Sequence, residues 1–358
     1  MSDQLYYDAI DLLKRLIATP SVSRSESAAA DVVYNFVTEN IPGVTPRRIG
    51  DNIYIPDPSF DAGRPTLLLN SHIDTVPAAD GWTRDPFKPD TDETGERLYG
   101  LGSNDAGASL VSLLAAYRAV VDISRSYNLI FVASAQEEVS GKDGLTAVLP
   151  HLPKVDCAIV GEPTGMRPAI AEKGLMVLDC TAHGKAGHAA RNEGINAIYK
   201  AIEAIDCLRS FKFENESPTL GPVKVSVTII NGGTKHNVVP DLCTFTADVR
   251  TTDAYSNIET LEILRQAVGD EIEMIPRSTR LNPSSIAADH PIVRRFEMLG
   301  FEPFGSPTLS DGALMPWPKV KAGPGESARS HTPDEYIKPD EIREAIEIYI
   351  KILTGLNL

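Results

Sequence analysis

The stretch Leu129–Gly141, LIFVASAQEEVSG, runs from an apolar segment directly into two adjacent glutamates. Its first residues, rich in Ile, Val and Phe, predict a buried strand, because buried parallel strands show continuous apolar runs instead of alternation. Adjacent carboxylates at the end of such a strand repel each other and resist loss of water. The stretch therefore predicts that a cation, most simply a metal ion, neutralises Glu137 and Glu138. The alternative is a solvated loop, where most glutamates lie.

Length and composition limit the class of protein. A chain of 358 residues exceeds one ordinary core, so we expect one large and one smaller domain. The contents of 42% apolar and 23% charged residues are typical of a globular protein. The net charge of -15 argues against nucleic acid as a partner and is compatible with a metal or a cationic substrate.

The cysteines and the apolar segments indicate the compartment. The four cysteines are widely separated and form no CxxC pair, so we expect free thiols in a reducing, cytoplasmic environment. The first residues show no basic region followed by a long apolar stretch, so we expect no secretory signal. No segment reaches the length of a membrane span, and we expect no membrane partner.

Two further apolar segments end in polar residues. Strands are predicted over Thr66–Asp74 and Asp156–Glu162, and an apolar helix over Ala108–Val121. Helices are also predicted over 5–18, 25–38, 291–299 and 339–353. Strands that alternate with helices and finish in possible ligands predict an α/β layer whose site lies at the carboxyl ends of its strands.

The pattern changes in the middle of the chain. Apolar and polar residues alternate there as in antiparallel strands, with two amphipathic helices between and after them. The expected elements are strands over 175–184, 223–230 and 243–251 and helices over 195–211 and 256–268. We therefore predict a smaller α+β domain at 175–284, inserted into a discontinuous domain of residues 1–174 and 285–358.

The strand ends and a late loop together supply a set of histidines and carboxylates. Its members are His72, Asp74, Asp105, Glu137, Glu138, Glu162 and His331. Such donors suit zinc and do not suit soft-metal chemistry. Each residue has a structural alternative: His72 as a core histidine, Asp105 as a helix cap and Glu162 as a turn residue. Together they are difficult to explain as independent accidents.

Five motifs in this order resemble one enzyme family. They are SHIDTVP at 71–77, GLGSNDAG at 100–107, QEE at 136–138, GEPT at 161–164 and HTPDE at 331–335. The family is the di-zinc amidohydrolases that include acetylornithine deacetylase, succinyl-diaminopimelate desuccinylase and glutamate carboxypeptidase. The resemblance covers nearly the whole chain. It implies a mixed-sheet, zinc-peptidase-like catalytic domain with an inserted lid and dimerisation domain.

The resemblance also implies roles for the donors. Asp105 would bridge two metals, His72 and Glu162 would complete one site, and Glu138 and His331 would complete the other. Zinc is the expected metal, with cobalt or manganese as alternatives. Glu137 would be the general base, which agrees with the chemistry of a positioned carboxylate. Asp74, two residues after His72, would accept its free imidazole N–H, or else cap the loop before Pro77.

The inserted domain carries motifs of its own. GKAGHA at 184–189 implies that His188 stabilises the tetrahedral oxyanion in the partner subunit of a homodimer. NGGTKHN at 231–237 implies a substrate contact from Asn237. DVR at 248–250 implies that Arg250 binds a substrate carboxylate. Without the resemblance, His188 would be a surface histidine and Arg250 an ordinary ion-pair partner.

Two loops bear on substrate choice. Many relatives carry serine after the lid histidine, whereas Ala189, Ala190 and Arg191 follow His188 here, so Arg191 is a candidate specificity residue or a surface residue. The loop Gly323–Glu326 precedes His331 as in relatives. Its Gly325 would let backbone N–H groups approach a substrate carboxylate.

The resemblance implies hydrolysis of the amide bond of an N-acyl amino acid. It favours N-acetylornithine, or an N-acetyl or N-succinyl citrulline, in arginine biosynthesis. A succinyl-diaminopimelate desuccinylase and a dipeptidase or carboxypeptidase are alternatives. A metal-free carrier or scaffold is the alternative outside the enzymes, and the filled ligand positions argue against it.

Overall fold

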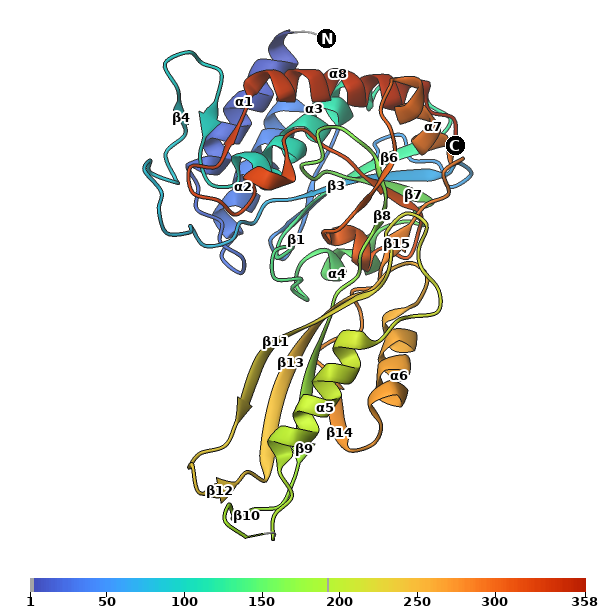
Figure 1. Cartoon of the computed structure of the whole chain (residues 1–358). Coiled ribbons are helices and arrows are strands. Elements are labelled where there is room, and N and C mark those ends of the chain that lie inside the picture. The colour runs from blue at the N-terminus through green and yellow to red at the C-terminus, as the bar shows by residue number, and fades with distance from the viewer. Residues whose placement is uncertain (1–2, 192) are drawn as a thin grey trace. The chain divides into compact units, whose positions relative to one another are not determined.

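The computed structural model describes residues 3–191 and 193–358, and the chain divides into two compact units. Unit 1 contains residues 1–170, 286–304 and 310–358, and unit 2 contains residues 171–285 and 305–309. Figure 1 draws both units, with unit 2 in green to orange. An insertion in the middle of the chain is thus observed. The roles of the units as catalytic and lid domains stay predictions.

The central element of unit 1 is a mixed sheet. Its strand order is β1-β2-β6-β3-β7-β17-β8-β15, and β16 also pairs with β8. β3 is parallel to β6 and β7, and β7 is parallel to β17, whereas β2 is antiparallel to β1 and β6, and β8 is antiparallel to β17 and β15. The strands are β1 Arg47–Ile49, β2 Asn52–Ile55, β3 Thr66–His72, β6 Asn128–Ser134, β7 Cys157–Val160, β8 Ala169–Glu172, β15 Ser284–Ser285, β16 Phe304–Ser306 and β17 Lys319–Lys321.

Both faces of this sheet are buried. In β6, Leu129 and Phe131 pack into the larger apolar cluster with the helices, whereas Ile130 and Val132 pack into a smaller cluster on the opposite face. In β3, Leu68 likewise faces the smaller cluster while its neighbours face the larger one. Successive strand residues point to opposite faces, so a strand covered on both sides must be apolar throughout. The continuous apolar runs were therefore interpreted correctly.

Helices form the layer over the larger cluster. α3 packs against α1, α8, β3 and β6, and Figure 1 shows α1, α3 and α8 together on one side of the sheet. The helices of unit 1 are α1 Asp3–Ile17, α2 Ser27–Asn40, α3 Ala108–Val120, α4 Leu145–Val148, α7 Pro291–Met298 and α8 Pro339–Gly355. The short strands β4 Asp90–Thr91, β5 Leu98–Tyr99 and β18 Tyr336–Ile337 form a separate small sheet. The longer helices confirm the predicted α/β layer.

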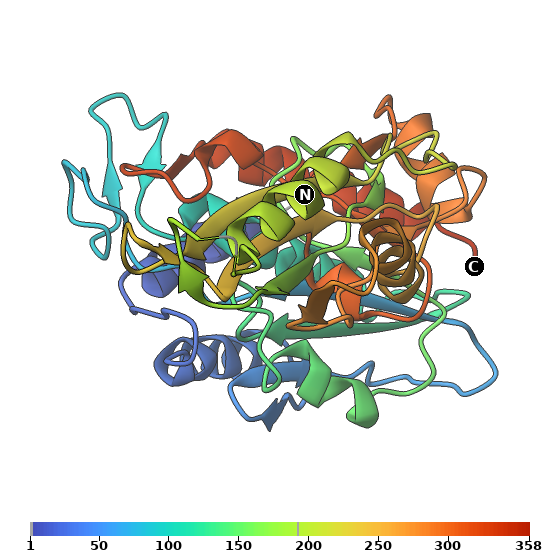
Figure 2. The same ribbon diagram turned by 60° about the horizontal axis from the view of Figure 1, so that its bottom comes forward.

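Unit 2 is a four-stranded antiparallel sheet with two helices. The strand order is β11-β13-β9-β14, and α5 packs against β9, β11 and β13, as Figures 1 and 2 show. The elements are β9 Met176–His183, β10 Gly187–His188, α5 Ala197–Ser210, β11 Lys224–Gly232, β12 Val238–Val239, β13 Leu242–Arg250, α6 Asn257–Val268 and β14 Ile272–Pro276. The predicted strand, helix, strand, strand, helix order is found for β9, α5, β11, β13 and α6, whereas the short strands β10 and β12 and the last strand β14 were not predicted.

The cysteines are unpaired, and the helices are not of the membrane-spanning kind in the described part of the chain. Each of the four cysteines is free, and three of them are buried. Across residues 3–191 and 193–358, none of the helices combines the length and the apolar character needed to span a membrane.

Candidate metal centre

The register of three strands gathers the site. Thr66 to His72 of β3 pair in parallel with Asn128 to Ser134 of β6, and Asn70 pairs with Val160 of β7. The carboxyl ends of parallel strands therefore meet at one edge, where open α/β sheets carry their sites. His72, Glu137 and Glu162 lie at or just beyond these ends.

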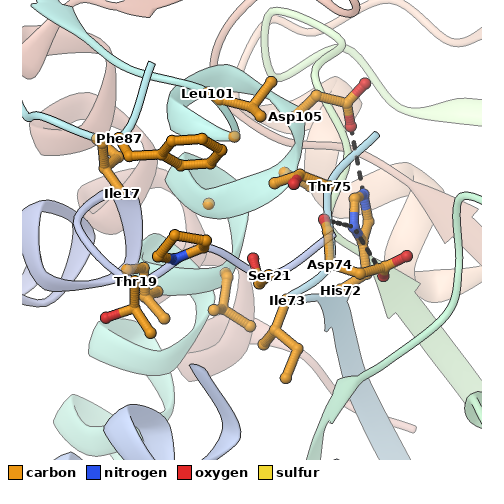
Figure 3. A pocket seen from close by; sticks show the side chains of 16 residues that line it. Ile17, Thr19, Ser21, His72, Ile73, Asp74, Thr75, Phe87, Leu101 and Asp105 are labelled. Carbon is orange, nitrogen blue, oxygen red and sulfur yellow. Dashed lines mark hydrogen bonds and ion pairs between the residues drawn. The ribbon is translucent and has the colours of Figure 1, made fainter. Parts of the chain in front are cut away.

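His72 is buried between two aspartates, as Figure 3 shows. Its Nδ1 lies 3.0 Å from the carbonyl oxygen of Asp74 and 3.4 Å from Oδ1 of the same residue. Its Nε2 lies 3.3 Å from Oδ1 of Asp105 and 3.8 Å from Oε1 of Glu162. Asp74 thus occupies the side of the ring away from Asp105 and Glu162, with its backbone carbonyl nearer than its carboxylate. This contact leaves Nε2 available as a ligand.

Asp105 lies between two histidines. Its Oδ1 faces Nε2 of His72, and its Oδ2 lies 3.7 Å from Nε2 of His331. Nε2 of His331 is in turn 3.0 Å from Oε2 of Glu138. One carboxylate that presents a different oxygen to each histidine has the arrangement expected of a bridging ligand. His331 is half-exposed, with 52% of its side chain accessible, so this side of the site is open.

The two glutamates occupy a turn held by buried carboxylates. Beyond β6 the backbone turns at Gln136, whose φ is 54°, and the amide of Ser140 donates to the carbonyl of Glu137 at 2.7 Å. The amides of Glu137 and Glu138 donate to the two carboxylate oxygens of Asp74 at 3.0 and 3.2 Å. A turn was expected, because adjacent side chains of an extended strand point in opposite directions.

The residues present fit a pair of divalent cations. Donor atoms lie within 4.8 Å of one another in two overlapping groups, which are His72, Glu137 and Glu162, and His72, Asp105 and Glu138. Burial, reinforced by neighbouring acids, raises the pKa of Glu137 and Glu162 well above the ordinary range, although His72 opposes the shift. Cations would remove that repulsion and stabilise the ionised carboxylates.

Proximity alone does not separate ligands from the base. The first of the two groups contains Glu137 with His72 and Glu162, whereas Asp105 joins His72 and Glu138 in the second. Asp105 is distinguished by its position, because it faces His72 with one carboxylate oxygen and His331 with the other.

A small pocket lies behind His72. It measures about 20 Å³, and Figure 3 shows it between Phe87, Leu101 and the segment after β3 that carries Asp74. That volume accommodates roughly one water molecule, for which about 10–15 Å³ is needed. The pocket is too small for a substrate.

Two buried acids beside the site, Asp311 and Glu26, were given no role in the sequence analysis. Asp311 accepts from Ser134 Oγ at 2.5 Å, and burial raises the pKa of Asp311 to about 6. Oε1 of Glu26 accepts the amide of Gln136 at 3.2 Å. A signal was present in the strands, because Asn70 and Ser134 are polar residues inside buried apolar runs and must have hydrogen-bond partners.

The structure brings together two of the predicted residues of unit 2. β10 pairs with β12 so that His188 lies opposite Val238, the residue after Asn237. The amide of Ala189 donates to the carbonyl of Asn237 at 3.0 Å, and both His188 and Asn237 are exposed. Side chains with this accessibility are free to contact a ligand.

The remaining predicted residues have different surroundings. Arg250, at the far end of β13 from β12, is half-buried and donates to both carboxylate oxygens of Asp248 at 2.8 and 3.2 Å. Arg191 is exposed, 3.7 Å from Glu193. Gly325 has a φ of 80°, and a Cβ at this position would lie 2.2 Å from Oδ1 of Asn104, so only glycine fits there without strain.

The fold and this centre define the class. The sequence model of the protein family described as Peptidase family M20/M25/M40 matches residues 68–355, a range that includes the candidate ligands. The chain belongs to this family and is a hydrolase. This result confirms the resemblance that the five motifs indicated.

Individual relatives agree with the family. The chain is 29% identical to the acetylornithine deacetylases of Salmonella arizonae and Klebsiella pneumoniae, over 96% of this chain and 96% of each relative. Among solved structures, it is similar to aminopeptidase PepT of Bacillus cereus, with a TM-score of 0.78, 18% identity and coverage of 97% and 98%. The Bacillus subtilis YXEP protein, a dinuclear metal binding peptidase, gives a TM-score of 0.74 at 16% identity and 98% coverage of both chains.

Proposed function

We propose that this protein is a di-metal hydrolase that removes the acyl group from an N-acyl amino acid, with N-acetylornithine as substrate. The observation that carries the proposal is the position of Asp105, with one carboxylate oxygen toward His72 and the other toward His331. Zinc is the proposed metal, and cobalt and manganese are alternatives suited to the same donors.

The ligands divide into two sets that share Asp105. His72 and Glu162 complete one set, and Glu138 and His331 complete the other. When bound at these ligands, divalent cations would polarise the scissile carbonyl group and make water more acidic. Asp74 keeps Nε2 of His72 directed at the site and fixes the backbone of Glu137 and Glu138.

Glu137 carries the proton. Its carboxylate takes a proton from the attacking water and delivers it to the nitrogen of the leaving amino acid. The group is partly buried and has a carboxylate oxygen within 4.8 Å of donor atoms of His72 and Glu162, which supports its placement beside the scissile bond. A carboxylate that cations keep ionised is a suitable acceptor at neutral pH.

Unit 2 supplies substrate contacts and the partner contact. We propose that Arg250 binds the substrate α-carboxylate, since its guanidinium already holds a carboxylate, that of Asp248, with two donors. Asn237 contacts the substrate and Arg191 tunes specificity, whereas Gly325 of unit 1 admits the substrate close to the backbone. His188 donates to the oxyanion in a homodimer.

The dimer is proposed to form through unit 2. Its α5 exposes Tyr199 and Ile202, at 65% and 52%, and its edge strand β11 exposes Ile229 and Ile230, at 52% and 50%. Exposed apolar side chains beside a strand edge suit association. Mixing Glu137→Ala with His188→Ala should restore about a quarter of wild-type activity, because half of the dimers are mixed and each has one complete site. No recovery in a confirmed dimer would contradict action across the interface.

Substrate identity is tested by a panel of amides. The purified protein, loaded with zinc, cobalt or manganese, is assayed with N-acetylornithine, N-acetylcitrulline, N-succinyl-diaminopimelate and a dipeptide. We expect kcat/KM to be highest for N-acetylornithine, with Glu137→Gln as the control for contaminating activity. A preference for the succinylated substrate or the dipeptide would overturn the assignment and leave the hydrolase class unchanged.

A further inference from the structure

A buried glutamate outside the proposed ligand set holds the backbone of the loop that carries Asp105. The Glu335 side chain accepts three backbone N–H groups, from Asn104 at 2.8 Å, from Asp105 at 2.9 Å and from Gly102 at 3.1 Å. Its backbone carbonyl accepts a fourth, from Gly100 at 3.0 Å. Glu335 is only 2% exposed, so solvent offers these amides no alternative partner.

The loop needs such a partner because of its own conformation. Gly102 has a φ of 75°, and the backbone at Asp105 lies outside the helical region, so the amides that precede α3 are not used in regular helical bonds. Successive amides directed to one side form a site for an anion. The carboxyl group of Glu335 fills this site; burial raises its pKa to about 8, and the three amide donors oppose that shift.

The same turn supplies a proposed ligand. His331 lies four residues before Glu335, and its Nε2 approaches both Asp105 and Glu138. A second link runs through Asn104, whose side chain donates to the carbonyl of Glu326 and accepts its amide, both at 3.1 Å. The loops of Asp105 and His331 are thus joined, independently of any cation, by the side chains of Glu335 and Asn104, each of which binds backbone groups of the facing loop.

We propose that Glu335 is a positioning residue of the metal centre, which directs the Asp105 carboxylate between His72 and His331. The inference rests on the proposed di-metal function and adds a residue to it. A bridging carboxylate must present its two oxygens in two directions, so a small rotation of its backbone would move both oxygens away from their positions. Residues that orient ligands typically change metal affinity or activity about 10–100-fold when replaced.

The test is a cobalt titration of metal-free protein in the full chain. Glu335→Gln keeps the shape and replaces one acceptor oxygen by an amide nitrogen that faces a donor. We expect the variant to bind cobalt about 10–100-fold more weakly than wild type and to show a changed visible absorption spectrum for bound cobalt. A purely structural residue would lower stability and leave the affinity and spectrum of the folded protein unchanged.

Asp334→Asn is the matched control. The Asp334 side chain also accepts backbone N–H groups, from Thr83 at 3.0 Å and from Arg84 at 3.2 Å, in a loop that carries none of the proposed ligands. We expect wild-type cobalt affinity for this variant. An equal loss of affinity in both variants would assign the effect to general destabilisation and overturn the inference.

The remaining outcomes separate the two proposals. Wild-type cobalt affinity and spectrum in Glu335→Gln would overturn the role of Glu335 alone, whereas failure of the wild-type protein to bind cobalt would overturn the proposed function. Circular dichroism checks folding. If Glu335→Gln does not fold, Glu335→Asp, which keeps the charge and is one methylene shorter, decides: weaker cobalt binding supports the role, and unchanged binding contradicts it.

Discussion

The two ends of strand β6 present buried carboxylates in opposite circumstances. At its start, Asp57 accepts the amide of Leu129 at 2.8 Å and pairs with Arg125 at 2.7 Å, and both charged side chains are almost completely buried. Beyond its end, Glu137 and Glu138 join Asp105 and other acids around His72. One end of the strand carries a balanced pair, and the other carries an excess of negative charge.

The pKa values of the acids at the two ends of β6 shift in opposite directions. Burial opposes ionisation of Asp57, but backbone N–H donors, Ser59 and Arg125 outweigh it and lower the pKa. Burial is also the largest influence on the pKa of Glu137 and of Glu162. Neighbouring acids raise these pKa values further, so both lie well above the usual range. The groups thus differ in how their burial is compensated: hydrogen-bond donors and Arg125 surround Asp57, whereas further acids surround Glu137 and Glu162.

The largest effect is expected at the site end. Glu137→Gln removes the proton acceptor and keeps the size of the side chain, so kcat should fall about 10²–10⁴-fold. The thermal midpoint should stay the same or rise, because a buried repulsive charge is lost. A steady-state assay with measured metal content checks this. Full activity with metals bound would show that Glu137 is not the base.

The opposite result is expected at the start of the strand. Arg125→Ala leaves Asp57 buried without its partner, which should lower the free energy of unfolding by about 3–5 kcal/mol. The kcat of the folded protein should be unchanged. Urea unfolding measures the loss, and Arg209→Ala is the control, because its pair with Asp206 is exposed and should contribute less than about 1 kcal/mol. Equal decreases in the free energy of unfolding of both variants would show that the buried ion pair stabilises the protein no more than the exposed one.

A smaller effect should appear as a pH dependence. The pKa of Asp57 is lower in the folded protein than in the unfolded chain, where it is about 3.9. Its stabilisation is therefore complete above that unfolded value and is lost as the pH falls through the folded value. The stability difference between wild type and Asp57→Asn should shrink as the pH falls below about 4. A constant difference would contradict the assigned direction.

The sequence predicted the elements whose residue pattern is typical of one kind of structure. Apolar runs predicted β3, β6 and β7, and polar residues directly after them predicted the site at their shared edge. The short strand β17 was not predicted, because two of its three residues are lysines, and β14 was not, because its five residues end in proline. Burial of such residues depends on partners far away in the chain.

The roles of Glu335 and Glu26 could not be predicted from the sequence, because these roles also depend on distant partners. Glu335 belongs to a quoted motif, but a side chain that accepts backbone N–H groups leaves no pattern in the residues that donate them. Glu26 likewise precedes α2 and reaches Gln136 across a separation of 110 residues. The proposed ligands have characteristic residue types, whereas the residues proposed to position them are recognised only in the folded protein.

The claim that the excess acids bind two cations is tested most directly by titration of metal-free protein with zinc. We predict two equivalents bound per chain, with activity restored in step. Asp105→Asn, which replaces one oxygen of the proposed bridge, should lose high-affinity binding at both sites. Absence of tight binding in the wild-type protein, or two unchanged sites in Asp105→Asn, would contradict the account.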